Sequence, residues 1–388
     1  MKRIYLDYAA ATPLDPRVLQ IMMPWLTTEF GNPSSLHYWG QQARAAVQKA
    51  REQVAHCLRV SAEELIFTSG GTEADNLAIR GYLRANHPEG GHIITTAVEH
   101  QAVLHTFSAL AQEGYTVTIL PVNNAGCVEA DDVRKALRKD TVLISCMYAN
   151  NETGMIQPIA DIGNIARDHH IIFHVDAVQA FGYLPVYPQT DHIDLLSICS
   201  HKIYGPKGMG TLYIRKGIEI SSEAYGGPQE HHLRAGTENV AGIVGFGAAA
   251  AILEKERQQR YDQARRLKKY MYETLSMNSA VFHLNGEWEH SLPNILDFSI
   301  SGIDNAVLLI ALDMQGVGVS AGSACEAGAV EPSHVLKAMG LPEKWTHSSV
   351  RVSFGAETTM EDVTEAVEII NRTVTDMLGK QSGNMSTL

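Results

Sequence analysis

The sequence has little positive charge and no cluster of it. Its 388 residues include 31 Lys and Arg against 43 Asp and Glu, which gives a formal net charge of -12. Proteins that bind nucleic acids directly draw much of their affinity from Lys and Arg residues that neutralise phosphates. Because no Lys/Arg-rich run offsets the acidic balance, we expect no direct binding to DNA, RNA or anionic membranes.

Cysteines and long apolar runs are also scarce. The five cysteines are an odd number without C-x-x-C spacing, which argues against a disulfide framework and against a metal site. Asp7 precedes any apolar segment of a secretory signal. The longest apolar run, residues 240–253, is shorter than the ~20 residues that cross a bilayer. We therefore expect a soluble, cytoplasmic protein with free thiols.

Short β-rich runs alternate with helix-length segments between residues 40 and 215. The runs are E-L-I-F-T-S, H-I-I-T-T, T-V-T-I-L-P, V-L-I-S-C-M, I-I-F-H-V-D, D-L-L-S-I and G-T-L-Y-I-R. Runs that are apolar on both faces predict an α/β fold with a mostly parallel sheet covered by helices. A charged helical stretch follows over residues 255–277, and then come new strand patterns, N-I-L-D-F-S-I and S-V-R-V-S-F. We predict a large domain over residues 15–257 and a smaller α+β domain from residues 1–14 plus 258–388.

Chemically useful residues follow several of the predicted strands. They are Gly70-Gly71-Thr72, Glu99-His100, Asn150-Asn151-Glu152, Asp176 with Gln179, and His201-Lys202. In an open parallel sheet, ligands bind at the carboxyl ends of the strands, so we expect these residues to meet there. The glycine-rich turn opens a predicted helix and could hold a phosphate, although a simple helix N-cap is the alternative.

Lys202 follows a strand directly and lies on a segment closed by G-P-K-G. Partial desolvation there would lower the pKa of its amine and favour Schiff-base chemistry, whereas an isolated lysine is more often a surface residue. Asp176 would supply the carboxylate that keeps the pyridine nitrogen of pyridoxal phosphate protonated. His100 offers a flat ring for stacking and a proton carrier. Together these residue types indicate a pyridoxal-phosphate site.

Cys325 stands in the stretch V-S-A-G-S-A-C-E-A-G-A-V-E-P. The stretch has neither helical nor strand periodicity, and its glycines and proline predict a mobile loop. A lone cysteine often behaves as a small hydrophobic residue that only fills space. The alternative is a reactive thiol, because a mobile loop would allow a nucleophile to move to a bound substrate.

The residues above carry a resemblance to a known family. The matching motifs are Y-L-D-Y-A-A-A-T-P, F-G-N-P-S-S-L-H, F-T-S-G-G-T-E-A-D-N, V-E-H-Q-A-V-L, A-N-N-E-T-G, F-H-V-D-A-V-Q-A, S-H-K-I-Y-G-P-K-G, R-A-G-T-E-N and G-S-A-C-E-A-G-A-V-E-P-S-H-V. Over nearly its whole length the chain resembles cysteine desulfurases of the NifS/IscS type, within the class V aminotransferases of pyridoxal-phosphate fold type I.

The resemblance implies a role for each residue. Lys202 would bond to pyridoxal 5'-phosphate, Asp176 would pair with the pyridine nitrogen, and Gln179 with the ring hydroxyl, while His100 would stack on the ring. The residues implied to hold the phosphate are Gly71, Thr72, Cys199 and His201, with Thr237 reaching it from the partner subunit of a homodimer. The substrate carboxylate would be bound by Asn151 and Arg351, and Asn151 would also contact the cofactor. The planar guanidinium of an arginine is well suited to binding a carboxylate.

The implied reaction converts L-cysteine to L-alanine and leaves a persulfide on Cys325, with Lys202 and His100 as the other catalytic residues. An acceptor protein would then take the sulfur for iron-sulfur clusters, tRNA thiolation or DNA phosphorothioation, which the sequence does not distinguish. A selenocysteine lyase or another class V pyridoxal-phosphate enzyme is the alternative. A pure sulfur-relay or scaffold protein is disfavoured, because it has no use for an intact Lys202, Asp176, His100 and Arg351.

Overall fold

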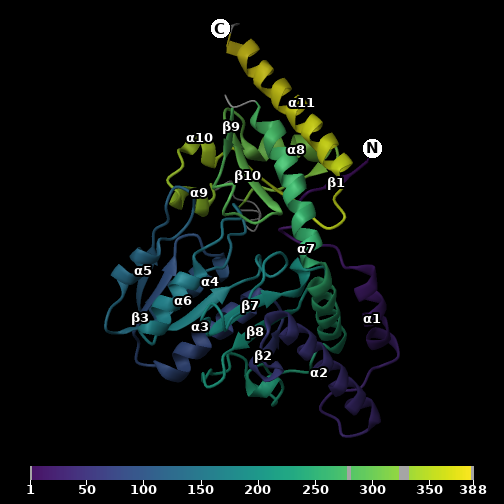
Figure 1. Ribbon diagram of the computed structural model, residues 1–388, viewed down its shortest axis with the longest axis vertical. Coiled ribbons are helices and arrows are strands. Elements are labelled where there is room, and N and C mark those ends of the chain that lie inside the picture. Colours follow the sequence, from purple (N-terminus) through teal and green to yellow (C-terminus); the bar gives the residue numbers. More distant parts are fainter. Residues whose placement is uncertain (1, 278–280, 323–331, 386–388) are drawn as a thin grey trace.

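The computed structural model describes residues 2–277, 281–322 and 332–385. Figure 1 shows a larger lower region built around a sheet and a smaller upper region, with helix α7 (Val240–Ser276) running through both. Cys325 lies outside the described residues. The fold matters for function because it decides which strand ends meet between the two regions.

The larger region is centred on one sheet. In the described part of the chain this sheet has seven strands in the order β2-β8-β7-β6-β5-β3-β4. Its strands are β2 (Leu65–Thr68), β3 (His92–Thr96), β4 (Thr116–Leu120), β5 (Thr141–Ser145), β6 (Ile172–Asp176), β7 (Leu195–Cys199) and β8 (Gly210–Ile214). Strands β4, β3, β5, β6 and β7 pair in parallel, and β8 pairs antiparallel with both β7 and β2. The predicted α/β fold with a mostly parallel sheet is confirmed.

Helices cover both faces of this sheet. Successive strand residues point to opposite faces, and accordingly Ile93 packs in one hydrophobic core while Ile94 packs in another. One core holds side chains of α3 (Gly71–Asn86) and α4 (Gln101–Gln112). The other holds side chains of α1 (Pro16–Thr27), α2 (Tyr38–Leu58), α5 (Ala130–Ala136), α6 (Ile159–Asp168) and α7. Burial on both faces explains why most of the strands are largely apolar, whereas Thr116 and Ile119 of the edge strand β4 are exposed.

The smaller region has its own core and short sheets. Strand β10 (Ile295–Ile300) pairs antiparallel with β9 (Phe282–Leu284) and β12 (Ser349–Ser353), and β1 (Ile4–Tyr5) pairs in parallel with β11 (Val317–Gly318). Its helices are α8 (Asn305–Met314), α9 (His334–Ala338), α10 (Glu343–Thr346) and α11 (Met360–Met385). Three 3-10 turns complete the described elements: η1 (Ala62–Glu64), η2 (Ser200–Lys202) and η3 (Glu230–His232). The domain limits 15–257 and 1–14 plus 258–388 stay a prediction.

Helix α7 differs from the sequence-based expectation. The charge pattern predicted a helix only over residues 255–277, but the helix begins at Val240 and includes the apolar run 240–253. That run contains three glycines, which weaken helix propensity, yet Ile243, Phe246 and Leu253 are buried in the core beneath the sheet. Tertiary packing therefore overrides local propensity here. Among the described helices, none is long and apolar enough to cross a membrane.

Candidate active site

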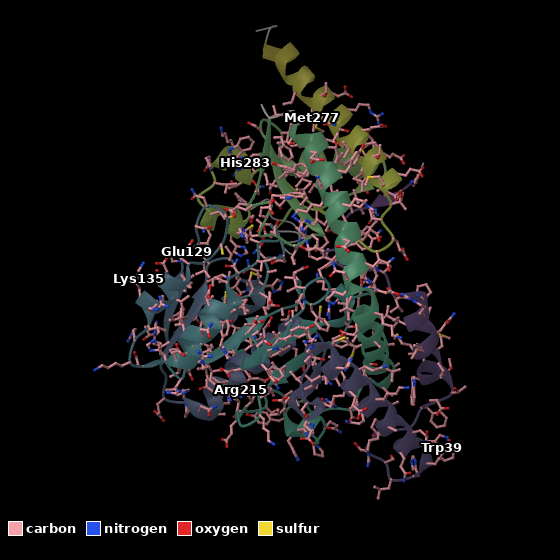
Figure 2. The ribbon with its side chains drawn as sticks, viewed as in Figure 1. Trp39, Glu129, Lys135, Arg215, Met277 and His283 are labelled. Carbon is pink, nitrogen blue, oxygen red and sulfur yellow. The ribbon has the colours of Figure 1, made fainter. Side chains whose placement is uncertain are left out.

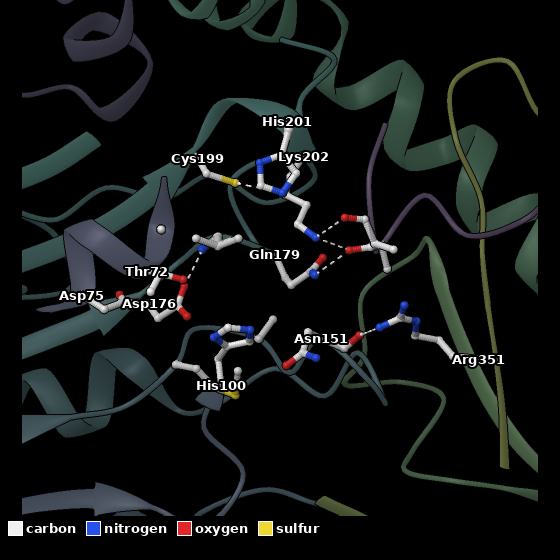
Figure 3. Close-up of a pocket in the computed structure, with 16 residues that line it drawn as sticks. Thr72, Asp75, His100, Asn151, Asp176, Gln179, Cys199, His201, Lys202 and Arg351 are labelled. Carbon is white, nitrogen blue, oxygen red and sulfur yellow. Dashed lines mark hydrogen bonds between the residues drawn. The ribbon is translucent and has the colours of Figure 1, made fainter. Parts of the chain in front are cut away.

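A cavity of about 380 Å³ opens at the carboxyl ends of the parallel strands (Figure 3). Its lining includes many of the residues that the sequence singled out: Gly71, Thr72, His100, Asn151, Asp176, Gln179, Cys199, His201, Lys202 and Arg351. Strand ends are the usual ligand position in open parallel sheets. We therefore take this cavity as the candidate active site, and the role of each residue in it stays a prediction.

Lys202 reaches the cavity from η2, the turn that directly follows β7. Its Nζ donates hydrogen bonds to the carbonyl oxygen of Ala10, at 2.9 Å, and to that of Ala9. Gln179 Nε2 donates to the same Ala9 oxygen at 3.0 Å. The N-terminal segment thus fixes the ends of both side chains, and Figure 3 draws these hydrogen bonds as dashed lines at one side of the cavity.

Two buried carboxyl groups lie on the other side of the cavity. Asp176 ends β6, and Asp75 comes from the first turns of α3. Burial raises the pKa of both groups, and the negative charge of Asp75 raises that of Asp176 further. His174 Nε2 is 3.5 Å from Asp75 Oδ1, but burial lowers the pKa of His174 to about 4, so its ring is neutral. This pair of carboxyls is therefore suited to a ligand that brings a positive charge.

His100 is the N-cap of α4. Its Nδ1 accepts the backbone N–H of Ala102 at 3.1 Å, so a neutral ring carries its proton on Nε2. The ring lines the cavity between the carboxyls and Asn151 (Figure 3). Because the hydrogen bond at Nδ1 fixes the orientation of this flat ring, the ring is suited to stacking on a planar ligand.

Neutral donors and a helix end gather near Thr72. Helix α3 begins at Gly71, so the unpaired backbone N–H groups of its first turn are directed at the cavity. Burial raises the pKa of the Cys199 thiol to about 12 and lowers that of His201 to about 4. Both side chains are therefore neutral at physiological pH. Hydrogen-bond donors and a positive helix end make this corner fit an anion such as a phosphate.

Arg351 enters the cavity from strand β12 of the smaller region. Its side chain is almost fully buried, and its Nη1 donates to the carbonyl oxygen of Asn151 at 2.8 Å. Its Nη2 forms an ion pair with Asp7 Oδ1 at 2.9 Å. The guanidinium is therefore oriented before any ligand arrives, and a fork of this kind binds carboxylates.

Comparison with known proteins identifies the family. The model of the family described as "Aminotransferase class-V" matches residues 4–365. The chain belongs to this family. Class-V relatives include cysteine desulfurase IscS of Dictyoglomus turgidum, 46% identical over 96% of this chain and 95% of its own, and putative cysteine desulfurase IscS 1 of Bacillus subtilis, 48% identical over 95% and 97%. A solved NifS-like protein, 36% identical, superposes with a TM-score of 0.90 over 96% of this chain and 99% of its own. The resemblance to NifS/IscS proteins is confirmed.

Class-V aminotransferases depend on pyridoxal 5'-phosphate, and the residues of the cavity fit that cofactor. Asp75 Oδ1 is buried and has no hydrogen-bond partner in the described part of the chain, and the Asp75–Asp176 pair is suited to a protonated pyridine nitrogen. The helix end and neutral donors at Thr72 are suited to the phosphate. An added Cβ at Gly71 would come within 2.7 Å of Val178 Cγ2, so glycine keeps this corner open.

Two predicted residues are not part of this cavity in the described chain. Thr237 is exposed and lines a separate hollow together with Ser69 and Glu230, and its predicted reach to the partner subunit stays untested. Cys325 lies outside the described residues. Described residues on either side of it along the chain lie close to Glu152. Ser333 Oγ donates a hydrogen bond to Glu152 Oε2, and a Cβ added at Gly322 would overlap that oxygen.

Sequence reasoning missed several residues that shape the site. Asp75 carried a usable signal, because it is a lone acidic residue among the apolar positions of α3. Asp7, Ala9 and Ala10 belong to the motif Y-L-D-Y-A-A-A-T-P, which supported the resemblance without a role. Their contribution depends on where the N-terminal segment lies, and no local pattern predicts that.

Proposed function

We propose that this protein is a pyridoxal-phosphate-dependent cysteine desulfurase, which converts L-cysteine to L-alanine and leaves a persulfide on Cys325. The observation that carries the proposal is the convergence of Lys202, the Asp75–Asp176 pair and Arg351 on one cavity. These groups supply a nucleophilic amine, a partner for a cationic ring nitrogen and a carboxylate clamp. The cysteine desulfurase names of the full-length relatives support the choice of reaction.

The cofactor would be held by residues from both sides of the cavity. Lys202 would hold it covalently, Asp176 at the ring nitrogen, Gln179 at the ring hydroxyl and His100 against the ring face. Gly71, Thr72, Cys199 and His201 would surround the phosphate, joined by Thr237 from the partner subunit. When bound, pyridoxal phosphate supplies an electron sink for carbanionic charge at the substrate.

The protein's own groups then bind the substrate and move its protons. Arg351 and Asn151 fix the carboxylate of cysteine, which sets the direction of its Cα–H bond. Lys202 Nζ takes up the Cα proton as general base. Because Nδ1 of His100 is occupied by Ala102, Nε2 is the atom from which that ring can donate a proton.

The sulfur step uses the Cys325 thiol. Its thiolate forms a new S–S bond with the substrate sulfur while the C–S bond of cysteine breaks. The carbon keeps the electron pair of that bond and takes up a proton, which gives the methyl group of alanine. Atoms and electrons balance without an added oxidant, and a persulfide remains on Cys325.

The destination of the sulfur is part of the proposal. We infer transfer to an acceptor protein in the cytoplasm, with iron-sulfur cluster assembly as the first candidate because relatives carry the name IscS. Isolation of proteins that gain labelled sulfur from the loaded enzyme tests this destination. If the labelled acceptors act only in tRNA thiolation or DNA phosphorothioation, that pathway would replace iron-sulfur cluster assembly as the destination.

The proposed reaction has a direct test. The cofactor-loaded protein should release one L-alanine for each sulfur atom that leaves L-cysteine, in the presence of a reductant that regenerates Cys325. Parallel reactions with L-selenocysteine and with an amino acid plus a 2-oxo acid cover the two alternatives. Activity on selenocysteine alone, or amino-group transfer without sulfur release, would contradict the proposal.

We also propose that the enzyme is a homodimer. Large apolar side chains are exposed along α1, α2 and the segment between them, including Leu26 at 59%, Phe30 at 78% and Leu36 at 83%. Figure 2 shows Trp39 at the outer edge of this part of the molecule. The rings of Phe30 and Trp39 stack with their centroids 6.5 Å apart, and exposed apolar side chains that gather in this way are typical of an interface. Sedimentation velocity should give the mass of two chains, and a monomer that binds the cofactor fully would contradict the dimer.

A further inference from the structure

The N-terminal segment contacts both ends of the proposed substrate position. Ala9 and Ala10 accept hydrogen bonds from Lys202 at one end, and Asp7 pairs with Arg351 at the other. Two further hydrogen bonds hold the backbone of this segment. Ala9 N–H donates to Ser353 Oγ at 2.8 Å, and Tyr5 Oη donates to the Asp7 carbonyl oxygen at 2.9 Å. Asp7 is therefore held in place next to the carboxylate clamp.

Asp7 approaches Arg351 from outside the cavity. Arg351 and Asn151 line the cavity, whereas Asp7 is not among its lining residues in the described chain. Asp7 holds Nη2 and the Asn151 carbonyl holds Nη1, while Nε is buried without a hydrogen-bond partner among the described residues. The guanidinium thus pairs with the Asp7 carboxylate on the side away from the cavity and can bind the carboxylate of a ligand on the cavity side.

The charge of Arg351 is balanced by Asp7. Asp297 is the cross-strand neighbour of Arg351 in the sheet of β10 and β12, but burial raises its pKa well above its usual range. The burial that raises this pKa disfavours a negative charge on Asp297. Within the described residues, Asp7 is the carboxylate in ion-pair contact with Arg351. In ion-pair contact, Arg351 is therefore matched by one carboxylate of the protein.

We propose that Asp7 is a specificity-determining residue that makes the clamp select α-amino acids over plain carboxylate anions; this inference rests on the proposed function. A plain carboxylate that binds Arg351 leaves the group of three charges with a net charge of -1 in a sheltered site, which is unfavourable. An α-amino acid brings an ammonium group as well, so the same group stays neutral. Without Asp7 the preference shifts toward the anion, because the anion then forms a neutral pair and the amino acid leaves a net positive charge.

The test compares L-cysteine with 3-mercaptopropionate, which has the same thiol and carboxylate but no amino group. For the holoenzyme carrying Asp7→Asn, we expect the inhibition constant of 3-mercaptopropionate to fall about tenfold, because one nearby negative charge is removed. The KM for cysteine should change less than about threefold, because loss of the Asp7 charge favours binding of the carboxylate of cysteine and disfavours binding of its ammonium group. Calorimetric binding of 3-mercaptopropionate, which is not turned over, should show the same tenfold gain.

Matched variants separate selectivity from structure. Asp7→Glu keeps the charge and should keep the wild-type discrimination, and Asp131→Asn removes an exposed carboxylate far from the cavity and should change nothing. Asp7→Ser provides a second neutral variant if the first does not fold. Weaker binding of both ligands by the neutral variants would mean that Asp7 only orients Arg351, and would overturn the inference, as would unfolding of both. Absence of alanine release by the wild-type enzyme would instead overturn the proposed function.

Discussion

Replacing Cys325 by alanine should leave the protein coloured and inactive. None of the residues that would hold the cofactor is changed, so its absorbance and the spectral response to added cysteine should stay as in the wild type. Release of alanine should fall by about 10³-fold or more, because the substrate sulfur loses its positioned nucleophile. Stopped-flow absorbance and quantification of alanine measure the two parts of this expectation separately.

The other cysteines supply the control for this experiment. Cys57, Cys146 and Cys199 are buried and Cys127 is partly buried, and burial raises the pKa of each thiol, so they are poor nucleophiles. After reaction with cysteine, mass spectrometry of the wild type should find added sulfur on Cys325 and not on these thiols. Unchanged turnover in the Cys325→Ala variant would mean that this thiol only fills space.

Lys202→Ala should have a comparably large effect with a different spectral signature. The variant loses both the covalent attachment of the cofactor and the amine that moves the Cα proton. A general base alone contributes about 10²–10⁴-fold, so turnover should fall by at least that factor. Unlike the Cys325 variant, this one should lose the absorbance of the lysine-bound cofactor.

Peptide mapping after borohydride reduction tests the assignment independently. The pyridoxyl group of the wild type should be found on Lys202, whose Nζ lies inside the cavity. Lys207, five residues further on and exposed, is the control. A label on Lys207, or full activity of Lys202→Ala, would show that the cavity is not the site of attachment.

Much of the fold and the site followed from local sequence patterns. The seven β-rich runs each became a strand of the large sheet. Most of these strands are buried on both faces, which leaves a nearly continuous apolar signal, and the exposed edge strand β4 was found from its β-branched residues. Lys202, Asp176 and His100 come together because parallel strands bring their carboxyl ends to one edge. That rule depends only on strand order and direction, so it can be applied to a sequence.

The remaining parts depend on contacts between distant segments. The ion pair of Asp7 with Arg351 joins residues 344 positions apart, and it forms because β1 pairs with β11 and the chain then passes along β12. The helical or strand periodicity of a sequence gives no information about a contact between such distant residues. The start of α7 was missed for a related reason, since its glycine-containing first half is stabilised by the surrounding core and not by its own propensity.

Helix α7 also limits how this enzyme can be divided into pieces. Its first half supplies Ile243 and Phe246 to the core below the large sheet, and its second half supplies Leu267 and Met271 to the core of the smaller region. A fragment that begins at residue 258 would keep those two side chains. It would lose Ile4 and Leu6, which also belong to the smaller core and are each worth about 1.5–3 kcal/mol when buried. The same cut would split a helix of about 55 Å in its middle. Expressing the two halves separately should therefore yield insoluble products, and shortening this protein requires removing surface segments instead.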